Sequence, residues 1–209
     1  MIRRAASLLL PLLLLAAGCT ATDVSGDAAS SRAPSPFVDC AGLTAAPAST
    51  PSARATPAGT ARPSDAARAD ALPKIELSCF TGGRGVPLGT IRGPIVINLW
   101  ASWCPPCRAE LPAFERLHQR TAGKLHVVGV DTKDTRAAAQ STGEDLGLTF
   151  PTLFDPDERL RLALGRNGLP MTLFVDADGR VRHVYQSTPL DDAALGALVE
   201  RHLGVGATA

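Results

Sequence analysis

Residues 95–107 read IVINLWASWCPPC, an apolar run that ends in two cysteines separated by two prolines. The first six residues are almost all apolar and rich in β-branched side chains, which is typical of a strand buried on both faces of a sheet. Residues 125–130 repeat this pattern. Between them, residues 104–121 carry apolar side chains at helical spacing, and Pro112 predicts a kink there. The sequence therefore predicts a βαβ unit with a right-handed crossover.

Further alternating elements follow this unit along the chain. Hydrophobic spacing predicts two more helices, and Asp-Ala-Asp-Gly at residues 176–179 predicts the turn of a β-hairpin. An amphipathic helix closes the pattern. These elements are expected at residues 136–146, 157–164, 171–175 with 180–185, and 190–203. Together with the βαβ unit they predict a single α/β domain over residues 72–205.

The charge balance of the chain excludes one class of partner. The 209 residues include 21 Lys and Arg against 20 Asp and Glu, so the formal net charge is +1. Domains that bind nucleic acid usually carry a strongly basic surface, so we expect no nucleic-acid partner. We expect the protein to be a monomer.

The amino terminus has the pattern of an export signal. Arg3 and Arg4 precede an apolar run at residues 8–17, which is too short to cross a bilayer as a helix. We therefore expect a signal peptide over residues 1–18. Ala16-Ala17-Gly18-Cys19 resembles the lipobox of bacterial lipoproteins, which implies that Cys19 is acylated and anchors the protein to a membrane. Plain cleavage and secretion, or twin-arginine export, are the alternatives.

Residues 19–71 are dominated by Ala, Ser, Thr, Asp and Pro. Almost no residue except Phe37, Val38 and Leu43 is large and apolar, so the segment cannot bury enough surface to offset the entropy of ordering it. We expect a disordered tether that lets the domain move above a membrane. A tolerated low-complexity insert is the alternative interpretation.

The two cysteines of the CPPC segment lie where the first strand gives way to the first helix. A helix amino terminus stabilises a thiolate and lowers its pKa from about 8.5. If Cys104 is the N-cap, Pro105 and Pro106 have no N–H to donate, so the first donor to the Cys104 sulfur is the N–H of Cys107. This predicts an accessible, attacking Cys104 and an inner, resolving Cys107, the arrangement needed for thiol–disulfide exchange.

A zinc site is the alternative interpretation of these cysteines. A structural zinc site needs a second pair of ligands. The sequence has no other C-x-x-C and no close Cys/His pair among His118, His126, His183 and His202. We therefore expect no metal and no cofactor.

The segments at residues 98–112, 129–131 and 168–176 resemble the thioredoxin superfamily, specifically its TlpA/ResA-like extracytoplasmic thiol–disulfide oxidoreductases in lipoprotein form. The resemblance covers most of residues 73–204. It implies a thioredoxin-like fold, with a central mixed sheet, helices on both faces and a helical insertion after the first βαβ unit.

The resemblance also implies roles for single residues. Pro170 matches the family's cis-proline beside the dithiol, and the backbone of Leu169 is expected to pair with an incoming peptide. Glu110 matches an acidic residue near the dithiol and is a candidate proton acceptor for Cys107; a solvated helix carboxylate is the alternative. Trp103 is expected to be an exposed contact surface for partner chains.

Four further residues are part of the predicted structure. Asn98 stands where plain thioredoxin has a buried aspartate, which leaves Glu110 as the nearest acid candidate. Trp100 is expected in the core. Cys40 and Cys79 remain, and thiols are seldom left free in an oxidising compartment, so we expect a structural disulfide between tether and domain. Two unpaired cysteines are the alternative.

The expected function is a lipid-anchored thiol–disulfide oxidoreductase on the extracytoplasmic face of the bacterial cell membrane. The resemblance implies a reductant of exported thiol proteins such as apocytochrome c, recharged by an integral membrane electron donor. An oxidase for secreted proteins is the alternative, because the CPPC sequence alone does not fix the reduction potential. A thioredoxin-like Cu(I) chaperone would use a three-residue spacer, and a peroxidase would need a threonine where Ala101 stands.

Overall fold

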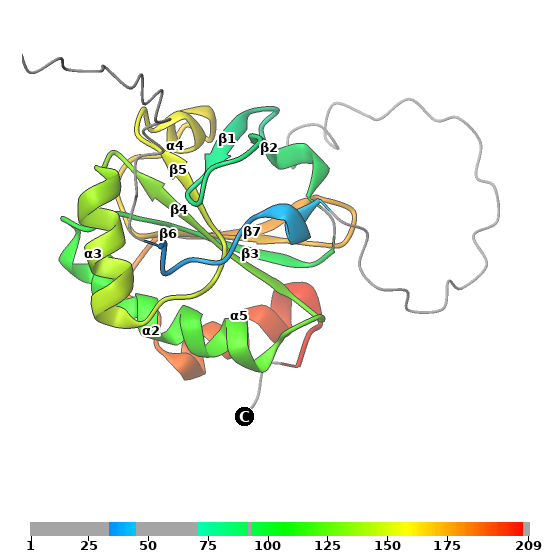
Figure 1. Ribbon diagram of the computed structural model, residues 1–209. Coiled ribbons are helices and arrows are strands. Elements are labelled where there is room, and N and C mark those ends of the chain that lie inside the picture. Colours follow the sequence, from blue (N-terminus) through cyan, green and yellow to red (C-terminus); the bar gives the residue numbers. More distant parts are fainter. Residues whose placement is uncertain (1–33, 45–70, 92, 207–209) are drawn as a thin grey trace, which may run out of the picture. The chain divides into compact units, whose positions relative to one another are not determined.

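The computed structural model describes residues 34–44, 71–91 and 93–206 (Figure 1). The predicted signal peptide, the lipobox with Cys19 and the tether residues 45–70 lie outside this part of the chain. Within it, no helix has both the length and the apolar character needed to cross a membrane.

One seven-stranded mixed sheet forms the centre of the domain, in the order β2-β1-β5-β4-β3-β6-β7. Strand β3, next to the middle strand β4, pairs in parallel with β4 and antiparallel with β6. The strands are β1 (Glu76–Cys79), β2 (Val86–Pro87), β3 (Ile95–Trp100), β4 (His126–Thr132), β5 (Thr152–Asp155), β6 (Met171–Val175) and β7 (Val181–Tyr185). The parallel β3–α2–β4 unit and the β6–β7 hairpin are both as predicted.

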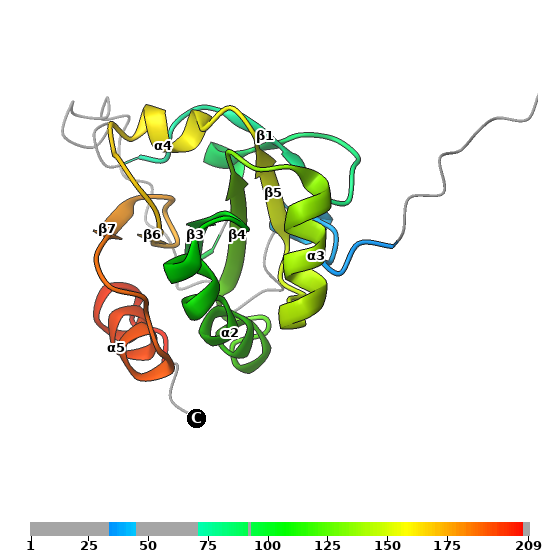
Figure 2. The ribbon, with the colours of Figure 1, turned by 90° about the vertical axis from the view of Figure 1, so that its left-hand side faces the viewer.

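Helices cover both faces of this sheet (Figure 2). The helices are α2 (Pro105–Arg120), α3 (Arg136–Leu146), α4 (Arg159–Ala163) and α5 (Asp192–Leu203), with short 3-10 helices η1 (Ala41–Leu43) and η2 (Leu88–Thr90). The first core layer contains side chains of α2, α3 and α5, whereas the second contains side chains of α4, η1 and η2. This is the predicted thioredoxin-like fold.

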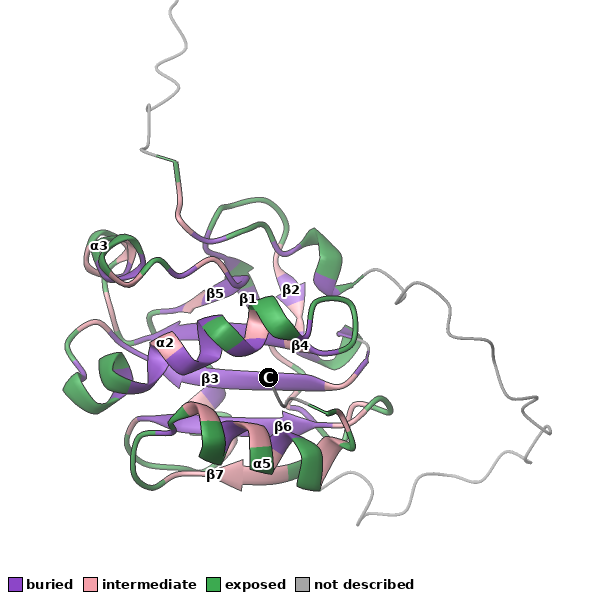
Figure 3. Ribbon diagram, turned by 90° about the horizontal axis from the view of Figure 1, so that it is seen from below, coloured by how far each residue is buried: buried purple, intermediate pink, exposed green. Residues whose placement is uncertain are grey.

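Strand β3 explains why the apolar run is continuous. All six of its residues are buried, as the colouring of Figure 3 shows for the central strands. Successive side chains of a strand point to opposite faces. Accordingly, Val96 and Trp100 pack in the layer of α2, and Ile95, Ile97 and Leu99 pack in the layer of α4.

Strands β1, β2 and β5 were not predicted from the sequence. Each has four residues or fewer, which is too short for hydrophobic alternation to be distinguished from a loop. The helix after the first βαβ unit, α3, is as predicted, and it leads into β5, which pairs in parallel with β4.

Residues 34–44, which we call the strap, belong to the folded domain, and this corrects the predicted tether over residues 19–71. Phe37 and Leu43 are buried, and the Val38 N–H donates to the Thr149 carbonyl at 2.9 Å. Phe37 packs edge-on against Phe80 with ring centroids 4.8 Å apart. The few apolar residues of the segment therefore provide the burial that its average composition lacks.

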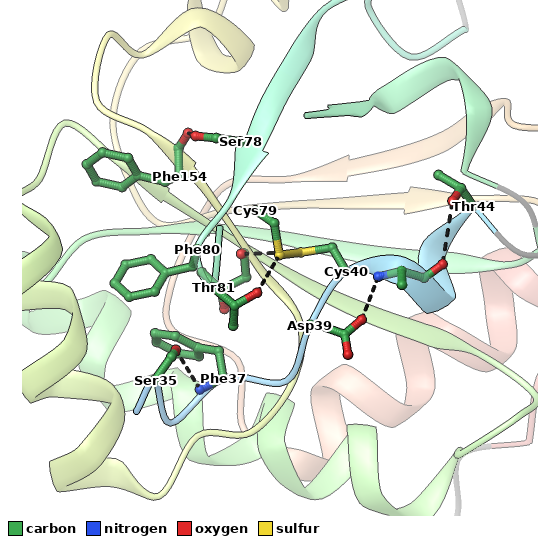
Figure 4. Close-up of a disulfide and its surroundings, with 12 residues drawn as sticks. Ser35, Phe37, Asp39, Cys40, Thr44, Ser78, Cys79, Phe80, Thr81 and Phe154 are labelled. Carbon is green, nitrogen blue, oxygen red and sulfur yellow. Dashed lines mark hydrogen bonds between the residues drawn. A yellow bond between two sulfur atoms is a disulfide. The ribbon is translucent and has the colours of Figure 1, made fainter. Parts of the chain in front are cut away.

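A disulfide joins the strap to β1 (Figure 4). The Cα atoms of Cys40 and Cys79 are 5.9 Å apart, and the two residues are separated by 39 positions. Both cysteines are buried. The bridge thus closes a loop that includes all of residues 45–70.

Candidate active site

Cys104 lies at the junction between β3 and α2. It has extended backbone angles (φ −100°, ψ 99°) and is the N-cap of α2, with the two prolines at the first helical positions. The Cys107 N–H donates to the Cys104 sulfur at 3.3 Å. This is the hydrogen bond expected when the prolines leave Cys107 as the first backbone donor. It favours negative charge on the Cys104 sulfur.

Cys104 and Cys107 are joined as a disulfide, with their Cα atoms 5.3 Å apart. Cys104 is only 4% exposed and Cys107 is 0% exposed. The sequence predicted a more accessible Cys104. In this oxidised state its sulfur is bonded to that of Cys107, and both cysteines belong to the same buried core layer.

Glu110 is a buried residue of α2, the helix that begins at the dithiol, and is not solvated as the alternative interpretation held. Its carboxyl accepts hydrogen bonds from the Asn98 side-chain amide at 2.7 Å and from the Leu190 N–H at 3.0 Å. Burial raises the pKa of Glu110 to about 7, although these two hydrogen bonds oppose the shift. A carboxyl with a pKa near neutrality can both release and accept a proton under ordinary conditions.

Asn98 links Glu110 to the sheet. Its side-chain N–H₂ also donates to the Thr172 hydroxyl at 3.3 Å, from β3 to the neighbouring β6. Its Oδ1 atom has no hydrogen-bond partner among the described residues. Asn98, which has no carboxylate of its own, therefore holds the Glu110 carboxyl in place.

Trp103 and Leu169, the residue before Pro170, line one pocket. The Leu169–Pro170 peptide bond is cis. Trp103 is 56% exposed and its indole N–H donates to the Lys133 carbonyl at 2.8 Å, whereas Trp100 is fully buried. A pocket of about 200 Å³ is lined by Trp103, Thr132, Lys133, Glu158, Arg161, Gly168 and Leu169. The structure thus brings together both residues that were expected to contact a partner chain.

Asp131 is an acidic residue that sequence reasoning did not single out. It lies in β4 opposite Trp100, is fully buried, and neither of its carboxyl oxygens has a hydrogen-bond partner among the described residues. Burial, followed by the nearby Asp134 carboxylate, raises the pKa of Asp131 to about 9. The available signal was an aspartate at the carboxyl end of a parallel strand, where functional groups of α/β proteins gather.

The described residues contain no cluster of three His, Cys, Asp or Glu side chains that could hold a metal ion.

This chain resembles known proteins at three levels, which are the sequences of curated relatives, the folds of solved structures and a family model. The thiol:disulfide interchange protein DsbE of Escherichia coli K12 is 42% identical over 91 residues, which is 43% of this chain and 48% of that protein. This chain therefore spans about half the length of the curated relatives it matches.

Two solved structures share the fold. One is a DsbF homologue from Corynebacterium diphtheriae, 26% identical, with a TM-score of 0.56 over 63% of this chain and 85% of that one. The other is a secreted Mycobacterium tuberculosis disulfide oxidoreductase, 22% identical, with a TM-score of 0.56 over 61% of this chain and 96% of that one.

A family model completes the comparison. The model of the AhpC/TSA family matches residues 69–184, which contain the CPPC segment, the cis-proline and strands β1 to β6. With the thioredoxin-like fold and a cysteine pair at the start of α2, the chain belongs to the AhpC/TSA family.

Proposed function

We propose that this protein is an extracytoplasmic thiol–disulfide oxidoreductase that works through Cys104 and Cys107. The observation that carries the proposal is the hydrogen bond from the Cys107 N–H to the Cys104 sulfur at the start of α2. The fold and the relatives named thiol:disulfide interchange proteins support it.

The reaction follows from the inequality of the two sulfurs. In the reduced protein, the Cys104 thiolate attacks one sulfur of a client disulfide and displaces the other client sulfur as a thiolate. Cys107 then loses its proton and attacks the Cys104 sulfur, which releases the second client thiolate. The client gains two electrons, and the protein is left with the Cys104–Cys107 disulfide.

Glu110 is proposed as the acceptor of the Cys107 proton. Cys107 is fully buried, so water cannot readily take this proton. Glu110 lies one helical turn further along α2, and its pKa of about 7 lets it bind a proton during the second attack and release it afterwards.

Trp103, Leu169 and Pro170 are proposed as the surface that receives the client. Trp103 is the exposed member, and both Trp103 and Leu169 line the 200 Å³ pocket. The free backbone next to a cis-proline would pair with an extended client segment, as the family resemblance implies.

The direction of electron flow and the location belong to the same proposal. We propose a reductant of exported thiol proteins such as apocytochrome c, recharged by an integral membrane electron donor, and anchored through acylated Cys19. The sequence resemblance supports each of these points. A reduction potential low on the scale of dithiol proteins would agree with a reductant, and a high one would indicate an oxidase.

Turnover and trapping together test the proposed function. The reduced protein should cleave the disulfides of insulin, and Cys104→Ser should abolish this activity. In a cell extract, Cys107→Ser should accumulate mixed disulfides on Cys104, because the resolving thiol is missing. Cys104→Ser is the matched control and should trap nothing. An inactive wild-type protein together with an empty Cys107→Ser trap would overturn the proposal.

A further inference from the structure

The pocket next to Trp103 has charged lining residues that the exchange reaction itself does not need. Trp103 and Leu169 are its apolar lining residues, and Lys133, Glu158 and Arg161 are its charged ones. A client segment bound to Trp103 and Leu169 would lie close to these charged side chains. The side chains there are therefore placed to contact the residues that flank the client cysteine.

Two of these residues have an unusual backbone conformation. Lys133 (φ 55°) and Glu158 (φ 56°) are the only non-glycine residues with positive φ in the described part of the chain, and both line this pocket. The left-handed conformation is unfavourable for side chains with a Cβ atom, and such residues concentrate at functional sites. Both conformations are held by one acceptor, because the N–H groups of Lys133 and Glu158 donate to the Asp155 carbonyl at 3.1 and 3.2 Å.

The ion pairs of the pocket leave one cation facing the solvent. The Glu158 side chain, only 12% exposed, pairs with Arg161 and with the Lys133 ammonium, the latter at 2.8 Å. Arg161 also donates to the Arg166 carbonyl at 2.8 Å, so it is fixed against the loop that precedes the cis-proline. The Lys133 side chain is 66% exposed, and an ammonium group has three donors. It can therefore bind a second carboxylate.

Two further carboxylates near the pocket, those of Asp155 and Asp134, accept hydrogen bonds from backbone N–H groups. The Asp155 side chain accepts the N–H groups of Arg159 and Leu160, each at 2.9 Å. The Asp134 side chain accepts the N–H groups of Ser102 and Thr135. Among the charged lining residues, two cations therefore face one anion, and the pocket has a net positive charge.

We propose that this pocket selects clients with an acidic side chain two residues from the reacting cysteine, and that Lys133 is its specificity-determining residue. The client carboxylate binds the Lys133 ammonium while the client sulfur is joined to Cys104. The inference rests on the proposed exchange function and adds to it a preference for acidic clients. It requires no change in the redox step, because Lys133 takes part in no bond that forms or breaks.

A set of three matched peptide disulfides tests this preference. The peptides differ at one position, two residues from the cysteine, which carries Glu, Gln or Lys. We expect kcat/KM for the Glu peptide to exceed that for the Gln peptide by roughly 2-fold to 5-fold, with the Lys peptide lowest. The difference should shrink as salt is raised, because exposed charges are screened.

Two variants test whether Lys133 causes the preference for the Glu peptide. Lys133→Gln should make the three peptides equal, whereas Lys124→Gln, which removes an exposed lysine outside the pocket, should keep the preference. Equal rates for all three peptides with the wild-type protein would overturn the acidic preference and leave the exchange function standing. A preference that survives in Lys133→Gln would overturn the role of Lys133. Failure to reduce any peptide would instead count against the proposed function.

Discussion

Glu110 shows how burial decides the chemistry of a single residue. The sequence left it open as a proton acceptor or a solvated carboxylate, because residue type and helical position are the same for both. In the structure the Glu110 carboxyl accepts hydrogen bonds from Asn98 and Leu190, and its burial raises its pKa to about 7. The burial of Asp131 could not be recognised from the sequence, since it depends on neighbours that are distant in sequence.

Glu110→Gln is expected to slow the second step of exchange. The variant keeps the size of the side chain but cannot accept the Cys107 proton, so resolution of the mixed disulfide at pH 7 should fall by roughly 10-fold to 100-fold. The wild-type rate should rise between about pH 6 and pH 8 as the Glu110 carboxylate forms. Stopped-flow measurement of client release across this range checks the prediction.

Glu144→Gln is the matched control, because Glu144 is an exposed carboxylate on α3. It should leave the rate and its pH profile unchanged. If Glu110→Gln resolves the mixed disulfide at the wild-type rate, Glu110 does not carry the proton. Unfolding curves of both variants separate this result from a loss of structure.

Asp131 makes the stability of the oxidised protein depend on pH. Its pKa of about 9 lies above the ordinary value of 3.8, so the folded state holds a proton that the unfolded chain releases. Stability should therefore fall as the pH rises through this window, by at most about 1.4 kcal/mol per pH unit. Above pH 7.5 the Glu110 carboxyl, with its pKa of about 7, has largely titrated.

Asp131→Asn isolates this contribution. Urea unfolding with both disulfides closed should show a smaller loss of stability from pH 7.5 to pH 9 in the variant than in the wild type. At pH 7 the variant should be the more stable of the two, because the unfolded wild-type chain has an ionised Asp131 that must take up a proton on folding. Parallel slopes for the two proteins would show that Asp131 is ionised in the folded state.

At the scale of elements, the length of a helix or strand and its hydrophobic pattern decide whether the sequence predicts it. Helix α2 could be placed because two prolines and a capping cysteine mark its start and apolar residues recur at helical spacing. Strands β1, β2 and β5 were missed, because they are too short to show a pattern. The strap was assigned to the tether because its mean composition conceals Phe37 and Leu43. Their burial depends on residues distant in sequence, and Phe37 packs against Phe80 and Trp100.

The strap packs closely against α3 at Gly143. A Cβ atom at this position would lie 2.7 Å from Phe37 Cζ and 2.9 Å from Pro36 Cγ. Although Ala is about 1 kcal/mol better than Gly in a helix, Gly143→Ala should destabilise the protein by roughly 1–3 kcal/mol through this overlap. Urea unfolding measures the change.

A double-mutant cycle with Phe37→Ala tests the cause. Phe37→Ala alone should destabilise by about 3 kcal/mol, but it removes the nearest clash, so adding Gly143→Ala should then cost at least about 1 kcal/mol less than it does in the wild type. Additive effects would mean that the strap does not pack on α3 as described.

At the scale of the whole molecule, the second disulfide joins the strap to the sheet. Cys40 and Cys79 are separated by 39 positions, and closing a loop of this size is worth about 4 kcal/mol in the chain-entropy model. The double variant Cys40→Ser/Cys79→Ser should lose stability of this order in urea unfolding. Its insulin reduction below the unfolding range should stay within about 2-fold of the wild type, because Cys104 and Cys107 are unchanged.

Loss of the exchange activity in the folded double variant would contradict this separation of roles. It would mean that the strap, which contacts Trp100 through Phe37 at a centroid distance of 6.2 Å, controls the active-site helix.

The central claim is that the start of α2 makes Cys104 the reactive thiolate, with Cys107 buried behind it. Alkylation of the reduced protein by iodoacetamide, followed over pH 4 to 10 and assigned by peptide mapping, tests it most directly. We predict that Cys104 is modified first, with a midpoint well below the ordinary thiol pKa of about 8.5, and that Cys107 reacts slowly throughout. Faster modification of Cys107, or a midpoint for Cys104 at the ordinary thiol value, would contradict the account.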